Sequence, residues 1–112
     1  MKINELQKTP AASICRIEGE VNINTSGELR KFCSAIIDRK IPTIVFDMSN
    51  VPYIDSSGLA TLVEMLQRLK RQGGSLKLAG LQKKVRDLFE VTKLEKLFEI
   101  FDSLEKAKET IL

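Results

Sequence analysis

The hydrophobic pattern of this 112-residue chain switches repeatedly between the period of a strand and that of a helix, which constrains its fold more than any other feature. Strands alternating with helices favour an α/β fold with a small, mixed, mostly parallel sheet of four or five strands and four helices. The predicted order is β-β-α-β-α-β-α-β-α. Strands are expected at 2–8, 12–18, 43–48, 75–79 and 97–101, and helices after 24–28, at 57–71, at 81–89 and after 102.

Local signals set the expected ends of these elements. Thr25 with Glu28, and Asp102 with Glu105, have the spacing of capping boxes, in which each side chain satisfies a backbone N–H at a helix start. Gly73-Gly74 predicts the end of the longest helix. The loop 49–52 is expected to lead into that helix.

The sheet itself follows from the same pattern. A short link lets the first two strands pair antiparallel. The run Thr43–Met48 is almost continuously apolar, which is typical of a central strand buried on both faces. Because the sheet is small, we expect the helices to crowd one of its faces.

Composition excludes several classes of protein. Hydrophobic residues make up 43% and charged residues 29%, which predicts one globular domain over 1–112. The net charge of +3 is too small and dispersed for a nucleic-acid-binding protein. No stretch approaches the roughly 20 apolar residues of a membrane span, and the first residues lack the apolar core of a secretory signal.

The cysteine and histidine counts limit the possible chemistry. Cys15 and Cys33 lie in a strand-like and a helix-like run, which favours buried thiols in a reducing cytoplasm. The chain has no histidine, so it lacks the usual general base of serine or cysteine hydrolases and the commonest ligand of transition metals. We therefore expect a cytoplasmic protein that is not an enzyme and has no cofactor or metal of its own.

The segment Asp55-Ser56-Ser57-Gly58 is the candidate functional motif, because it lies where an apolar strand gives way to an amphipathic helix. Four interpretations are open. Asp55 or a serine can cap the helix, Ser56 can be a nucleophile, the helix start can bind a phosphate ligand, or Ser56 can be phosphorylated. Neither a Gly-x-Ser-x-Gly motif nor a phosphate-binding glycine loop is present, which disfavours the second and third interpretations.

Phosphorylation would act on a partner more than on the fold. A phosphoserine adds about −1.5 to −2 charges, which the positive end of a helix tolerates. Burying that charge in an interface is costly, and a loss of about 3 kcal/mol weakens binding more than about 100-fold. The same serine can thus leave the fold intact and switch off an interaction.

At this point the residues resemble those of the STAS domain family, and especially the stand-alone bacterial anti-sigma factor antagonists. Asp55-Ser56-Ser57-Gly58-Leu59 follows an Ile-Val-Phe-Asp-Met-Ser strand, as in the family signature. Further matching pieces occur in the family's order over nearly the whole chain: Gly19-Glu20-Val21-Asn22, Gly73-Gly74, Val85-Arg86-Asp87-Leu88-Phe89 and 94–101.

The resemblance implies a STAS-like fold and a role in partner switching during transcription regulation. The unphosphorylated antagonist would bind an anti-sigma factor that is also an ATP-dependent serine kinase, which frees the sigma factor. That kinase would phosphorylate Ser56 and so abolish binding, and a phosphatase would reset the switch. ATP would belong to the kinase.

By the same resemblance, the partner-binding residues are two groups that would lie side by side. One group is the motif with Leu59, and the other is the loop Glu20, Val21 and Asn22. Family members often carry Asp where this chain has Asn22, so one interface charge is missing. The alternative within the family is a STAS subunit of a stress-sensing scaffold or of a membrane-transport complex, without a sigma-factor role.

Overall fold

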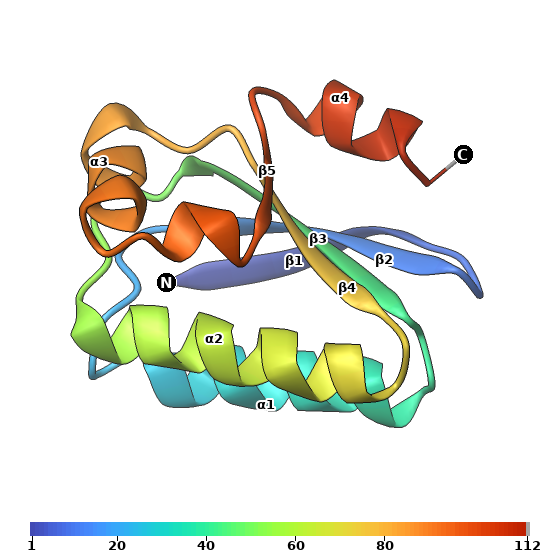
Figure 1. Ribbon diagram of the computed structural model, residues 1–112. Helices are drawn as coiled ribbons and strands as arrows, with labels where there is room; N and C mark the ends of the chain where they lie inside the picture. The colour runs from blue at the N-terminus through green and yellow to red at the C-terminus, as the bar shows by residue number, and fades with distance from the viewer. Residues whose placement is uncertain (112) are drawn as a thin grey trace.

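A five-stranded mixed sheet forms the middle layer of the computed structural model, which describes residues 1–111 (Figure 1). The strands are β1 (Lys2–Lys8), β2 (Ala12–Glu18), β3 (Thr43–Asn50), β4 (Ser75–Ala79) and β5 (Glu99–Phe101). The helices are α1 (Ser26–Asp38), α2 (Ser56–Arg71), α3 (Lys83–Val91) and α4 (Leu104–Glu109), with a 3-10 turn η1 (Leu94–Lys96) before β5.

The strands follow one another in space in the order of the sequence, β1-β2-β3-β4-β5. β1 pairs antiparallel with β2, whereas β2, β3, β4 and β5 pair in parallel. Each parallel pair is joined by a segment that contains a helix, as parallel strands require. The predicted element order and the mixed, mostly parallel sheet are therefore confirmed.

The main core lies between the sheet and the helices α1 and α2, which run side by side along one face (Figure 1). Phe46 from β3, Leu62 from α2 and Phe89 from α3 are fully buried there. Cys15 and Cys33 are also buried, and burial raises the pKa of their thiols to about 11 and about 12. The prediction of buried thiols is confirmed.

The opposite face of the sheet is covered by α4, so the expectation that all helices crowd one face is wrong (Figure 1). Ala107 of α4 packs on Ile14, Val45 and Ala79, which point away from the main core. Strand residues alternate in direction, so a β3 strand with Val45 on one side and Phe46 on the other needs cover on both faces. The buried central strand was predicted, and α4 supplies its second cover.

Both predicted capping boxes are wrong in their details. Thr25 precedes α1, but its backbone has helical dihedral angles and its hydroxyl makes no capping bond. Instead, the hydroxyl oxygen accepts the backbone N–H of Asn22 at 2.9 Å, because a tight turn brings that N–H close. At α4 the cap is one residue later than predicted, where Ser103 accepts the N–H of Lys106.

Several element ends also differ from the prediction. β3 continues through Ser49 and Asn50, which were expected in a loop, and α2 begins at Ser56 rather than at 57. α3 begins at Lys83 rather than at 81, and η1 takes up residues just before the shortened last strand. Periodicity marks the centre of an element well, whereas its ends depend on hydrogen bonds that the pattern does not contain.

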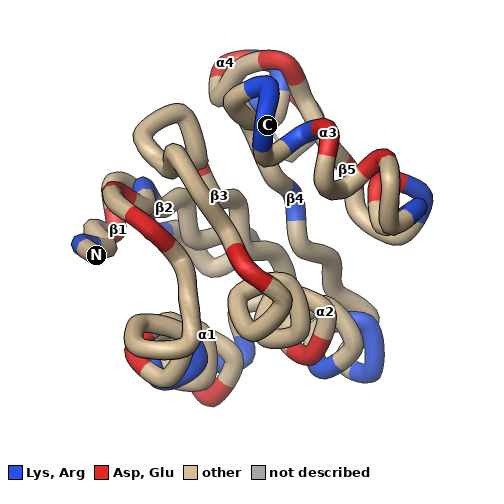
Figure 2. The backbone as a smooth tube through the Cα atoms, turned by 90° about the vertical axis from the view of Figure 1, so that its left-hand side faces the viewer, with Lys and Arg blue, Asp and Glu red and all other residues tan. Residues whose placement is uncertain are grey.

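Every helix carries both basic and acidic residues, and the two signs are interspersed around the described chain (Figure 2). Within residues 1–111, no helix is long and apolar enough to cross a membrane.

Candidate functional site

The carboxyl ends of the parallel strands β2, β3 and β4 lie at one edge of the sheet, and the loops that follow them meet there. These loops cover residues 19–25, 51–55 and 80–82. In open α/β sheets this edge is where ligands and partners usually bind. The Asp55-Ser56-Ser57-Gly58 motif lies at this edge, at the beginning of α2.

Asp55 joins two of these loops through its carboxylate. Its Oδ1 atom accepts the backbone N–H of Gly58 at 2.9 Å, which caps α2. Its Oδ2 atom accepts the backbone N–H of Ile23 at 3.1 Å. One side chain therefore stabilises the start of α2 and holds the loop after β2 against it.

The backbone of Val21 makes a second connection between the same loops. Val21 and Ile54 form a parallel β-bridge. The N–H of Val21 donates to the carbonyl of Tyr53 at 3.1 Å, and the N–H of Asp55 donates to the carbonyl of Val21 at 3.1 Å. The prediction that the loop Glu20-Val21-Asn22 lies beside the motif is thus confirmed in position.

Gly58 is required by this close approach. A Cβ atom at position 58 would lie 2.6 Å from Ile54 Cγ1 and 2.7 Å from the carbonyl oxygen of Val21. Atoms cannot approach so closely, so a larger residue would push the loop away from α2. The prediction of Gly58 as a position of close backbone approach agrees with this geometry.

Ser56 and Ser57 differ in their surroundings although both lie in the first turn of α2. Ser56 is exposed, and its hydroxyl has no hydrogen-bond partner within residues 1–111. Ser57 is half-buried, and its carbonyl accepts the hydroxyl of Thr61 at 3.0 Å. Because Asp55 is the cap, the capping interpretation applies to Asp55 and not to either serine.

The remaining predicted residues divide into surface and support. Glu20 is exposed and Asn22 is half-buried, with the amide oxygen of Asn22 accepting the N–H of Asn24 at 2.9 Å. Val21 and Leu59 are buried, with 0% and 8% of their surface exposed. Their side chains therefore stabilise this edge of the sheet from the core and are not offered to a partner.

Two exposed apolar side chains beside the motif were not predicted as site residues. Ile23 is 72% exposed and Tyr53 is 51% exposed, although both are large and hydrophobic. Such residues clustered near a polar motif are typical of protein-binding surfaces. Their position next to Asn22 and Ile54 in the sequence is the signal that could have revealed them.

Two features that are common in catalytic centres are missing from the described residues. The chain contains no histidine to act as a base for Ser56. Among the described residues, no group of three or more Cys, Asp or Glu side chains is arranged to hold a metal ion. An exposed hydroxyl on a rigid, partly apolar surface is suited to modification and to contact with another protein.

Known proteins with similar sequences and folds were found for most of the chain. The sequence is 29% identical over 90 residues to the anti-sigma-B factor antagonist of Bacillus subtilis, covering 74% of this chain and 83% of that protein. The crystal structure of an anti-sigma factor antagonist from Mycobacterium paratuberculosis superposes with a TM-score of 0.85 at 23% identity, covering 98% of this chain and 94% of that one.

The same fold occurs in a second class of protein. The crystal structure of a sulfate transporter family protein from Wolinella succinogenes superposes with a TM-score of 0.76 at 21% identity, covering 86% of this chain and 80% of that one. Both structural likenesses concern the fold. The family model of the STAS domain matches residues 4–107, and the chain therefore belongs to the STAS domain family.

Proposed function

We propose that this protein is an anti-sigma factor antagonist that works by partner switching. In its unphosphorylated form it binds an anti-sigma factor that is also a serine kinase, and the sigma factor is released. Phosphorylation of Ser56 by that kinase abolishes binding, and a phosphatase restores it. The protein acts in the cytoplasm as a binding module without catalysis of its own, and ATP is bound by the kinase.

The observation that carries this proposal is the separation of capping from exposure in the first turn of α2. Asp55 makes the capping bond, and the hydroxyl of Ser56 is exposed without a partner in the described chain. A phosphate on Ser56 would break no hydrogen bond of the fold and would lie at the positive end of α2. A partner that covers Ser56 would bury the new charge, and the free energy of that burial would weaken binding.

The docking surface consists of the exposed or half-buried side chains around that hydroxyl: Glu20, Asn22, Asp55, Ser56 and Ser57. Val21, Gly58 and Leu59 support it from below. A kinase needs access to the hydroxyl, and a partner needs a rigid surface, because ordering a loose one costs binding free energy. The bonds from Asp55 and Val21 provide that rigidity.

The test is phosphorylation of the purified protein with ATP by anti-sigma factors of the cell that produces it, with the site located by mass spectrometry. We expect one phosphate on Ser56, none on the Ser56→Ala variant, and unchanged phosphorylation of the matched Ser57→Ala variant. A phosphate on Ser57, or none on either serine in the presence of an anti-sigma factor that binds, would contradict the proposal.

A second candidate function is favoured by the fold shared with the sulfate transporter family protein. In that case the chain would be a STAS subunit of a transport complex or of a stress-sensing scaffold, using the same surface. Affinity purification from the native cell distinguishes the two functions. Recovery of a transporter ATPase or a multi-copy scaffold, without a kinase, would favour the second.

A further inference from the structure

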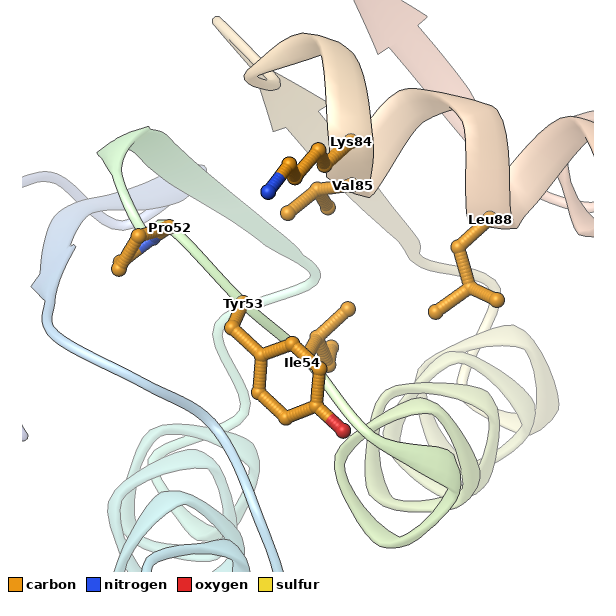
Figure 3. Close-up of a pocket in the computed structure, with 6 residues that line it drawn as sticks. All are labelled: Pro52, Tyr53, Ile54, Lys84, Val85 and Leu88. Carbon is orange, nitrogen blue, oxygen red and sulfur yellow. The ribbon is translucent and has the colours of Figure 1, made fainter.

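A cavity of about 320 Å³ opens between the segment before α2 and the helix α3. It is lined by Pro52, Tyr53, Ile54, Lys84, Val85 and Leu88 (Figure 3). The first three residues lead directly into Asp55 and Ser56, so the cavity lies beside the docking surface. We call it the α3 pocket.

The α3 pocket has an apolar floor and an accessible rim. Ile54 and Val85 are each only 2% exposed and form the buried part. Tyr53 is 51% exposed, and the side chains of Tyr53, Lys84 and Leu88 surround the opening (Figure 3). A pocket of this kind is suited to an inserted apolar side chain, since insertion removes both surfaces from water.

The floor of the α3 pocket is shared with the turn that carries Ser56. The side chain of Ile54 lines the pocket and also occupies the space beside Gly58, where a Cβ would come within 2.6 Å of it. The carbonyl of Tyr53 accepts the N–H of Val21. A partner that covers Ser56 therefore meets a preformed pocket in the same rigid surface, which lowers the cost of binding.

The charges on α3 indicate what should lie next to the inserted side chain. Lys83 pairs with Asp87 at 2.8 Å, and Arg86 pairs with Glu90 at 3.6 Å and with Asp102 at 3.5 Å. Lys84, at the rim of the pocket, forms no ion pair with any acidic group in residues 1–111. An unpaired cation at the edge of an apolar pocket complements a carboxylate on the bound partner.

We propose that the α3 pocket is a second anchor point for the anti-sigma factor, filled by an apolar side chain of that partner with an Asp or Glu close enough to pair with Lys84. This inference rests on the proposed function and extends it, because it identifies where binding strength arises at a distance from the phosphorylated serine. The pocket and Lys84 would also fix the orientation in which the partner covers Ser56.

The first experiment places a photo-crosslinking amino acid at position 53, 23 or 91 in cells that produce the protein. Position 53 probes the pocket, and position 23, whose backbone N–H bonds to Asp55, probes the border of the docking surface. Val91 is 81% exposed on α3 and does not line the pocket, so it is the matched control. We expect positions 23 and 53 to crosslink to the same anti-sigma factor and position 91 to none. The site crosslinked from position 53 should be an apolar residue within one helical turn of an Asp or Glu.

The outcomes separate the two proposals. If position 23 crosslinks to an anti-sigma factor and position 53 does not, or reaches a segment without an acidic residue, the pocket proposal is overturned and the proposed function stands. A small molecule bound in the pocket without protein crosslinks at position 53 would overturn it as well. If neither position reaches an anti-sigma factor, both proposals fail.

The captured anti-sigma factor then allows the pocket to be measured by calorimetry. We expect Tyr53→Ala and Lys84→Glu each to weaken binding about tenfold, and Lys84→Arg to keep it. Lys70→Glu makes the same charge change at an exposed position near the far end of α2 and should have no effect beyond twofold. Equal affinity of Lys84→Glu and Lys70→Glu would contradict the role of Lys84.

Discussion

In the first turn of α2, Ser56 is on the outward side and Gly58 is on the inward side. The two sides serve different purposes, although these residues are only two positions apart. On the outward side, Ser56 is exposed and its hydroxyl has no bond within the described chain. On the inward side, Gly58 is buried against Val21 and Ile54 with no room for one further carbon atom. Changes on the outward side should alter binding alone, whereas changes on the inward side should alter stability first.

This difference explains how a modification can control binding without unfolding the protein. A phosphate adds about −1.5 to −2 charges, more than any natural side chain carries, and the fold tolerates it best where the modified side chain makes no contact that the fold needs. Asp55 frees Ser56 from the task of capping, since the carboxylate already accepts the N–H of Gly58. The following predictions test whether Asp55 stabilises the helix start while Ser56 affects binding alone.

The largest expected effect is on binding. Ser56→Asp and Ser56→Glu should weaken binding to the anti-sigma factor about 100-fold or more, because a buried, unpaired charge costs about 3 kcal/mol or more at the interface. Their melting temperature should stay within about 2 °C of the parent, because exposed substitutions change stability little. Isothermal titration calorimetry and thermal melting measure the two quantities.

The matched control for these acidic variants is Gln67→Glu, which adds a negative charge at an exposed position of the same helix. It should bind like the parent. Equal losses of binding and of thermal stability in Ser56→Asp would show that the outward side also supports the fold, and the comparison would fail.

The next effect is on stability and tests the inward side. Gly58→Ala should lower the free energy of unfolding by about 1–3 kcal/mol, because its Cβ overlaps the carbonyl oxygen of Val21. Gly27→Ala is the matched control, since a Cβ at this helical glycine meets nothing within 4 Å. It should raise stability by about 0.5–1 kcal/mol through helix propensity. Urea unfolding compares them, and similar values for both would refute the close approach.

A smaller effect is expected at Asp55, which links the two sides. Asp55→Ala should cost about 1 kcal/mol through loss of the cap. It should also speed amide hydrogen exchange at Ile23 and Gly58, the two N–H groups that the carboxylate accepts. Ser103→Ala, which removes the cap of α4, is the control and should leave exchange at both groups unchanged. Unchanged exchange in Asp55→Ala would mean that the carboxylate does not hold the loop.

The smallest effect is a pH dependence from the opposite face of the sheet. Burial raises the pKa of Asp47, but hydrogen bonds from Ser49 and the ion pair with Arg16 outweigh it and hold the pKa below its usual value. The unfolded chain therefore binds a proton first as the pH falls. The resulting stability is present above about pH 5 and is lost as the pH falls through the folded-state pKa.

Urea unfolding between about pH 6 and pH 3 should show this loss, worth less than about 1 kcal/mol because Arg16 is partly exposed. Asp47→Asn should remove this contribution, so its stability should vary less with pH. Binding to the partner at neutral pH should be the same for Asp47→Asn and the parent, because Asp47 lies away from the docking surface. A steeper pH dependence in Asp47→Asn would contradict the assignment.

The order of elements could be predicted because it depends on local pattern. The stripes of Leu62, Met65 and Leu69 in α2 and of Leu76 and Leu78 in β4 repeat at the periods of a helix and a strand. The position of the motif at the start of α2 was predicted for the same reason, since a polar Asp-Ser-Ser run follows an apolar strand. Helix caps at Thr25 and Asp102 were predicted wrongly, because a cap depends on backbone angles that the residue type does not determine.

Residues far apart in the sequence had to be brought together by the sheet. Val21 and Ile54 are neighbours because β2 and β3 run parallel, and the need for glycine at position 58 follows from that contact. The α3 pocket combines residues 52–54 with residues 84–88. Periodicity is a property of a few adjacent residues, and it determined where the strands, the helices and the serine at the start of α2 would be. The pairing of strands that are 30 residues or more apart in the sequence decided which side chains surround that serine, because only the folded sheet sets the distances between those side chains.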